Sequence, residues 1–152
     1  MKYVTSGPMT ASQVLEKATE IIDEKYCRGA KFSCPEETKS YLRHKLGVAE
    51  REIFAVIYLD NQNQIIQYEE VFFGTLDAAS IYPREVVKQA LAHNAGAVIL
   101  AHNHPSGLST PSESDKRLTK RLINALKLVD IRVLDHIVVG DTCYSFAEEG
   151  EL

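Results

Sequence analysis

A five-residue run near the middle of the chain, Ala-Val-Ile-Leu-Ala at positions 97–101, constrains the fold more than any other feature. All five residues are apolar, so the run has no polar face, and it lies between two segments with helical periodicity. A short strand that is apolar on both faces is typical of a sheet covered by helices on both sides. We therefore predict an α/β fold in which residues 97–101 form a strand at the centre of the sheet.

The segments around this run supply the helices and the remaining strands. Apolar residues at helical spacing, with Pro and Gly near the ends, predict helices within 10–26, over about 34–46, within 83–96 and within 110–129. β-rich runs around turn-forming residues predict one hairpin with strands at about 51–59 and 64–73, and a second hairpin around Gly140 and Asp141. The resulting order, ααββαβαββ, indicates an α/β sandwich around one mixed sheet.

Capping boxes place the starts of two of these helices. Ser33 is followed three residues later by Glu36, and Thr110 is followed three residues later by Glu113. In such a box the hydroxyl accepts from a backbone N–H of the first turn and the carboxylate accepts from the capping residue. We therefore expect Ser33 to cap the second helix and Thr110 to cap the fourth.

The composition fits one globular domain without covalent cross-links. The chain has 152 residues, of which 45% are apolar and 25% charged, and this is enough to bury a core. Because Cys27, Cys34 and Cys143 are scattered and form no Cys-x-x-Cys pair, we expect reduced thiols. No apolar run approaches the roughly 18 residues of a membrane span, and the N-terminus lacks the apolar region of a signal peptide. We therefore expect a cytoplasmic protein with no membrane association.

The net charge of −4 argues against a chain that coats nucleic acid. One predicted helix nevertheless carries a group of basic residues, Lys116, Arg117, Lys120, Arg121 and Lys127. Such a group is typical of a solvated helix face, and it can also contact an acidic partner or a phosphate backbone. Nucleic acid therefore stays open as a partner, and the sequence predicts no particular oligomeric state.

Two histidines follow the central strand at the point where the apolar run ends. His102 and His104 are two residues apart, so in an extended chain their imidazoles point to the same side. Ser112 and Asp115 share one side of the first turn of the next predicted helix. If this turn folds back over the strand end, Asp115 becomes a third ligand. Two histidines and one carboxylate leave a coordination position open for water, which is typical of a catalytic Zn²⁺ site.

Each part of this pattern also has an ordinary structural explanation. A histidine at a strand end is commonly just a polar residue, and Ser-x-x-Asp at a helix start is commonly a cap. Other histidine motifs do not fit the residues present. In HNH nucleases the three residues are dispersed over a hairpin and a helix, and metallo-β-lactamases have Asp-His after the two histidines. Zinc deaminases need His-x-Glu and Cys-x-x-Cys, and the HExxH motif of zincins is absent from this sequence. The combined pattern favours a metal site over the structural explanations.

The spacing His102-x-His104-(seven residues)-Ser112-x-x-Asp115 resembles the JAMM motif of the JAB/MPN metalloprotease superfamily at every defined position. Further strings, such as "YPREVVKQAL", "AHNHPSG", "VLDHIVVGD" and "SFAEEG", are similar to the C-terminal domain of the bacterial RadC family over about 50–150. The resemblance implies a JAB/MPN-type α/β sandwich, a mixed β-sheet flanked by helices in the cytidine-deaminase-like architecture. Longer RadC proteins carry a helix-hairpin-helix-like region at the N-terminus, so this chain resembles a short, single-domain member. We expect an N-terminal helical extension over 1–30 and the JAB/MPN domain over 31–152.

The same resemblance implies a zinc-dependent hydrolase. It would be a metallopeptidase or isopeptidase that cleaves an amide bond in a peptide or protein substrate. Its Zn²⁺ ligands would be His102, His104 and Asp115. The family name also gives an alternative, a DNA-repair-associated or nucleic-acid-binding factor.

Further residues receive roles from the resemblance or from their position. Glu52 corresponds to the glutamate of the JAMM pattern and would act as the general base, whereas Glu69 and Glu70 on the neighbouring strand are alternatives. Ser112 would donate a hydrogen bond to the oxyanion of the tetrahedral intermediate. His136 lies on a predicted strand, where it would either orient a metal ligand or be a core histidine with satisfied hydrogen bonds.

Overall fold

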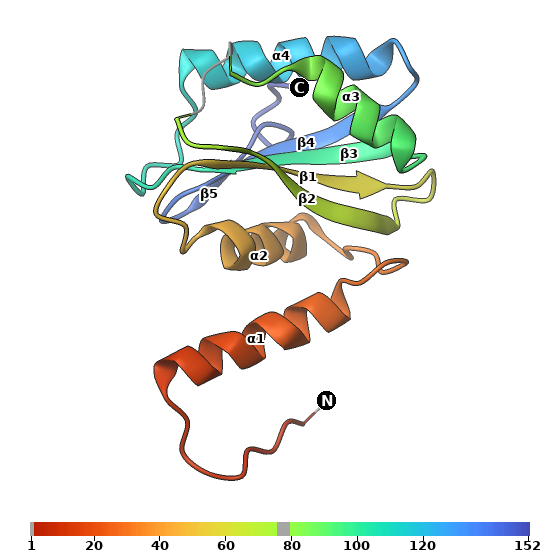
Figure 1. The fold of residues 1–152 in the computed structure, drawn as a ribbon. Helices are drawn as coiled ribbons and strands as arrows, with labels where there is room; N and C mark the ends of the chain where they lie inside the picture. Colours follow the sequence, from red (N-terminus) through yellow and green to blue (C-terminus); the bar gives the residue numbers. More distant parts are fainter. Residues whose placement is uncertain (1, 76–79) are drawn as a thin grey trace.

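The computed structural model of the chain describes residues 2–75 and 80–152 (Figure 1). The helices are α1 (Ala11–Lys25), α2 (Pro35–Leu46), α3 (Pro83–Ala92) and α4 (Glu113–Lys127). The strands are β1 (Ile53–Leu59), β2 (Ile65–Phe73), β3 (Ala97–Asn103), β4 (Arg132–Val139) and β5 (Cys143–Ser145). Their order in the described residues confirms the predicted ααββαβαββ pattern.

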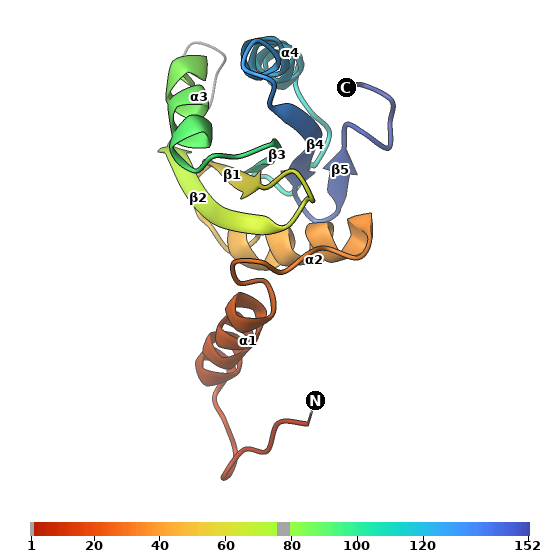
Figure 2. The same cartoon turned by 90° about the vertical axis from the view of Figure 1, so that its right-hand side faces the viewer.

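The five strands form one mixed sheet in the order β2-β1-β3-β4-β5. β1 pairs antiparallel with both β2 and β3, β3 pairs parallel with β4, and β5 returns antiparallel to β4. β3 is therefore the central strand, and all seven of its residues are buried. α3 and α4 cover one face of the sheet and α2 covers the other, so the predicted α/β sandwich is confirmed (Figures 1 and 2).

A hydrophobic core lies on each face of the sheet because the side chains of β1 alternate between the two faces. Phe54, Val56 and Tyr58 pack on the side of α3 and α4, and the residues between them pack on the side of α2. The whole of β1 is buried. Leu100 of β3 belongs to the α3 and α4 side, so His102, two residues later, lies on that side too.

The helix starts differ from the expected ones at two places. The N-cap of α2 is Cys34, and Ser33 donates its backbone N–H to Glu37 instead of pairing with Glu36. The N-cap of α4 is Ser112 and not Thr110, because the side chains and backbones of Ser112 and Asp115 form a reciprocal capping box. The Thr110 prediction was therefore wrong by two residues.

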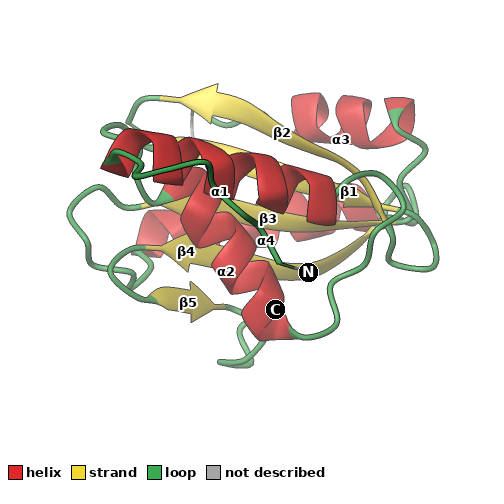
Figure 3. Cartoon of the chain, turned by 90° about the horizontal axis from the view of Figure 1, so that it is seen from below, coloured by secondary structure: helices red, strands yellow, loops and turns green. Residues whose placement is uncertain are grey.

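α1 lies outside the sandwich, with α2 between it and the sheet (Figures 1 and 3). All residues of α1 lie within the described part of the chain, and none of these helix residues is buried. A hydrogen bond of 3.0 Å between Thr19 Oγ1 and His44 Nε2, and an ion pair between Asp23 and Lys45, hold it against α2. Among the described residues, no helix is long and apolar enough to cross a bilayer.

Candidate metal centre

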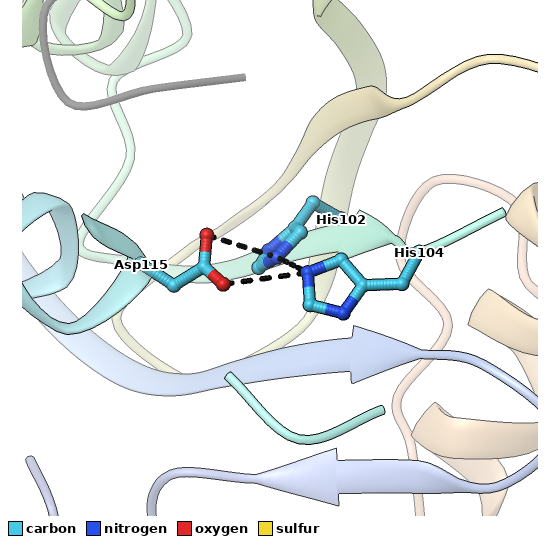
Figure 4. A group of neighbouring side chains, drawn as sticks. All are labelled: His102, His104 and Asp115. Atoms are coloured by element: carbon cyan, nitrogen blue, oxygen red, sulfur yellow. Dashed lines mark hydrogen bonds and ion pairs between the residues drawn. The ribbon is translucent and has the colours of Figure 1, made fainter. Parts of the chain in front are cut away.

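Three side chains converge where β3 ends and α4 begins (Figure 4). The Nε2 atoms of His102 and His104 are 3.0 Å apart. Asp115 Oδ1 lies 3.3 Å from His102 Nε2, and Asp115 Oδ2 lies 3.3 Å from His104 Nε2. The structure therefore brings together the three residues that the motif singled out, and their donor atoms point toward one another.

The donor atoms of the three residues lie close enough together to hold one metal ion. One ligand atom from each residue can be chosen so that all three lie within 4.8 Å of one another. The two 3.3 Å separations end on different oxygens of Asp115, so the carboxylate faces both imidazoles. Two imidazole nitrogens and one carboxylate oxygen are the donor types that Zn²⁺ takes in catalytic sites, where a fourth position is left for water.

The turn after β3 places His104. Its backbone N–H donates to Val139 O at 2.8 Å, which extends the pairing of β3 with β4 beyond the last strand residue. Its Nδ1 atom lies 2.7 Å from Leu108 O. A carbonyl can only accept, so Nδ1 carries the proton and Nε2 is left for the site. Gly107 closes this turn with a φ of 87°, a left-handed conformation that favours glycine.

Asp115 has two roles at the start of α4. Its Oδ2 accepts the backbone N–H of Ser112 at 2.7 Å, and its own backbone N–H donates to Ser112 Oγ at 3.1 Å. Its carboxylate also faces both imidazoles. The helix cap and the candidate metal site therefore share the Asp115 carboxylate, and the cap fixes it in front of His102 and His104.

The electrostatics of the site couple Asp115 to the histidines. Burial alone raises the pKa of the Asp115 carboxyl, but the imidazoles of His102 and His104 outweigh it and lower the pKa well below its usual range. The Asp115 carboxylate in turn raises the pKa of His104, and the hydrogen bond to Leu108 and the charge of Glu52 act in the same direction. The charged form of the His104 imidazole is therefore stabilised beside Asp115, and a metal ion bound at this point would compete with its Nε2 proton.

Glu52 lies directly before β1, beside His104. Phe54 pairs with His102 in the antiparallel register of β1 and β3, so two residues further along each strand Glu52 comes opposite His104 and on the same face. The Glu52 side chain is half-buried, and its charge raises the pKa of His104. The position suits a general base, and that role stays a prediction.

The two alternative glutamates of β2 lie elsewhere. Glu69 is hydrogen-bonded to His93 of the segment after α3, with 2.7 Å between Glu69 Oε1 and His93 Nε2. Glu70 pairs with Ala55, whose side chain lies on the α2 face of the sheet, and it accepts a hydrogen bond from Tyr68. These positions favour Glu52 over both.

Asn103 is a site residue that sequence reasoning missed. Its buried side-chain amide accepts from the Ile53 backbone N–H at 2.7 Å and donates to Arg51 O at 3.0 Å. These two bonds hold the backbone on both sides of Glu52. The available signal was its place between two histidines at the end of a buried strand, where the intervening side chain has to point to the opposite face.

His136 and Thr119 form the layer behind His102. His136 is fully buried on β4, and its Nε2 lies 2.8 Å from His102 Nδ1. Its Nδ1 lies 2.6 Å from Thr119 Oγ1, which in turn donates to Asp115 O at 2.7 Å. Burial, followed by the neighbouring His102, lowers the pKa of His136 well below its usual value. Sequence reasoning missed Thr119, although it is four residues after Asp115 and on the same helix face.

A cavity of about 330 Å³ opens beside His104. Its walls come from the segment after α2, from the turn after β3 and from the end of β4, and they include Glu50, Gly107 and Asp141. Of the three converging side chains, His104 alone lines this cavity.

The basic residues of α4 are mostly exposed, as expected for a solvated helix face. Lys116 pairs with Glu151 at 2.8 Å, which neutralises part of the group. Binding of nucleic acid through this face stays a prediction from the sequence.

A family model described as the RadC-like JAB domain matches residues 32–151 of the chain. Two curated proteins from Vibrio cholerae serotype O1, both called "UPF0758 protein", are 60% and 56% identical to the chain. The first match covers 93% of this chain and 90% of that protein, and the second covers 99% and 96%. A "UPF0758 protein" from Cellvibrio japonicus is 59% identical over 91% of this chain, which spans 62% of that protein's length.

Proposed function

Because the chain belongs to the RadC family of JAB-domain proteins, we propose that it is a zinc-dependent hydrolase that cleaves an amide bond with water. One observation carries this proposal, the convergence of His102, His104 and Asp115, whose donor atoms lie within 4.8 Å of one another. The JAB-domain family and this group of residues are both compatible with a hydrolase.

His102, His104 and Asp115 would hold the metal. A zinc ion held by these residues would supply a Lewis acid and would lower the pKa of a coordinated water to about 7. The protein contributes the fixed geometry of the donors, through the end of β3 and the capping box of α4. This rigid support keeps the three donors in place before the ion binds.

Glu52 would act as the general base and acid. Its carboxylate would take a proton from the attacking water and deliver it to the nitrogen of the leaving amine. Its half-buried position beside His104 and the two hydrogen bonds of Asn103 around it support this role.

Ser112 would donate a hydrogen bond to the oxyanion that develops on the substrate carbonyl. Its hydroxyl oxygen accepts from the Asp115 backbone, so the hydroxyl hydrogen is available as a donor. The side chain is exposed, so a substrate can reach it. The cavity beside His104 would take a peptide or protein segment, and the substrate would then be a peptide or an isopeptide.

The metal site is tested by measuring the zinc content of the purified protein. We expect one zinc ion per chain in the parent and a large loss in Asp115→Ala and His104→Ala. Equal zinc content in the parent and both variants would refute the assigned ligands.

The activity is tested by incubating zinc-loaded protein with a peptide library and with isopeptide-linked substrates. Glu52→Gln is the matched control because it keeps the shape of the side chain. We expect this variant to retain zinc and to lose turnover by about 10²–10⁴-fold. Cleavage that continues at the parent rate in Glu52→Gln would exclude Glu52 as the base.

A further inference from the structure

We infer that His136 and Thr119 are positioning residues that fix the tautomer of His102, so that its Nε2 lone pair faces Asp115 and His104. This inference rests on the proposed function, since it assigns these two residues to the same metal site. Its evidence is a continuous chain of hydrogen bonds that runs behind His102 and ends on the backbone of Asp115.

The direction of these hydrogen bonds is determined where the series ends, at the backbone carbonyl of Asp115. Asp115 O is a carbonyl and can only accept, so the hydrogen bond of 2.7 Å from Thr119 Oγ1 uses the single hydroxyl proton of Thr119. Thr119 Oγ1 must therefore accept from its other partner, His136 Nδ1, at 2.6 Å. His136 thus carries a proton on Nδ1.

The position of the proton on His136 determines the position of the proton on His102. The ring of His136 is fully buried and packs against the rings of Phe54 and Phe146, at centroid distances of 5.7 and 4.9 Å. A charged imidazole in such apolar surroundings is costly, so the ring is neutral and its Nε2 has no proton. His136 Nε2 must then accept from His102 Nδ1, which lies 2.8 Å away. His102 therefore carries a proton on Nδ1, and Nε2 is the nitrogen that faces the site.

The chain of hydrogen bonds connects two parts of the site. It runs from the backbone carbonyl of Asp115 through Thr119 and His136 to Nδ1 of His102, whose Nε2 lies 3.3 Å from the Asp115 carboxylate. His104 has a simpler arrangement, because Leu108 O alone holds its Nδ1 proton. Both imidazoles thus present Nε2 to the same point while a hydrogen bond holds Nδ1, an arrangement typical of metal-binding histidines.

A core histidine with satisfied hydrogen bonds would give the same burial, so the test has to separate positioning from packing. Thr119→Val removes the hydroxyl and keeps the branched shape of the side chain. Thr119→Ser keeps the hydroxyl and loses a methyl group. Both variants retain the imidazole of His136, so the core around Phe54 and Phe146 stays filled.

Two readouts are combined on these variants. Long-range ¹H–¹⁵N NMR of histidine-labelled, metal-free protein at pH 8 reports which nitrogen of His102 and His136 carries the proton. Competition with a chromogenic chelator reports the affinity for zinc. In the parent we expect a proton on Nδ1 of both residues. In Thr119→Val we expect a mixture of tautomers at His102 and zinc binding that is about 10–100-fold weaker.

Thr119→Ser should return the parent tautomers and a zinc affinity within about 3-fold of the parent value, because its hydroxyl can make both hydrogen bonds. The inference would be overturned if His102 of the parent carries its proton on Nε2. It would also be overturned if Thr119→Val keeps both the tautomer and the zinc affinity.

These results also separate this inference from the proposed function. A parent protein that shows the expected tautomers but binds no zinc would refute the hydrolase proposal and support the hydrogen-bond chain. A parent that binds and uses zinc, with no effect of Thr119→Val, would leave the hydrolase in place and refute the positioning role.

Discussion

Gly107 lies in the turn that carries His104, and replacing it with alanine should weaken the metal site more than it weakens the fold. Its φ of 87° is in the left-handed region, where an added Cβ costs about 1–2 kcal/mol. That Cβ would also lie 2.7 Å from a carboxylate oxygen of Asp141. Asp141 is exposed and can rotate away, so the backbone strain accounts for most of the lost stability.

A matched control exists elsewhere in the chain. Gly29 has a φ of 89°, and a Cβ there would meet nothing within 4 Å. Its backbone N–H bonds to Ile65 at the start of β2, at the end of the sheet opposite His102. Gly29→Ala therefore carries the same backbone strain without touching the site.

We expect both variants to lower the free energy of unfolding by about 1–2 kcal/mol, which for a chain of this size lowers the melting temperature by about 2–4 °C per kcal/mol. Only Gly107→Ala should also weaken zinc binding, by about 10-fold, because moving the turn displaces Leu108 O from His104 Nδ1. Calorimetry and chelator competition measure the two effects. Equal zinc affinity in the two variants would refute the idea that this turn orients His104.

Three further predictions concern neighbouring residues. Asn103→Ala should reduce turnover by at least 10-fold with little change in zinc content, because it frees the backbone around Glu52; unchanged turnover in a peptidase assay would contradict this. Adding zinc at 100 times its dissociation constant should raise the stability by about 2.7 kcal/mol in the parent but not in His104→Ala, as measured by urea unfolding. In metal-free protein, the lowered pKa of Asp115 stabilises the fold at pH values above 3.8, the ordinary pKa of an aspartate. The raised pKa of His104 stabilises the fold fully below pH 6.5, the ordinary pKa of a histidine, and this stabilisation is lost as the pH rises through the pKa of His104 in the folded protein. The stability lost in Asp115→Asn should therefore be largest between about pH 4 and 6.5, and a constant loss up to pH 9 in urea titrations would contradict the coupling.

The central strand of the sheet can be predicted from the sequence because the pattern that indicates it lies within one short run of residues. Residues 97–101 have no polar face, so they must lie where helices cover both sides, and β3 is indeed the central strand. The start of α4 is harder because Thr110 and Ser112 both have capping potential. The reciprocal capping box between Ser112 and Asp115 decides between them.

The first layer of the site is also readable from sequence, whereas the layer behind it is not. His102, His104 and Asp115 are close in sequence, and simple strand and helix periodicity brings them together. His136 is 34 residues after His102 and reaches it only through the parallel register of β3 and β4. No local pattern fixes that register, so the sequence alone does not place His136 against His102.

The cap shared by Ser112 and Asp115 has a consequence for how this chain can diverge. A substitution that removes the Asp115 carboxylate also removes an anchor of the first turn of α4, so under the proposed function loss of the metal ion and fraying of the helix would begin together. A descendant that loses the proposed metal site but keeps the fold would need a replacement at position 115 that still accepts the Ser112 N–H, such as asparagine or glutamine. Such a replacement would mark a protein that has lost the Asp115 carboxylate but has kept the cap, and therefore the stability, of α4.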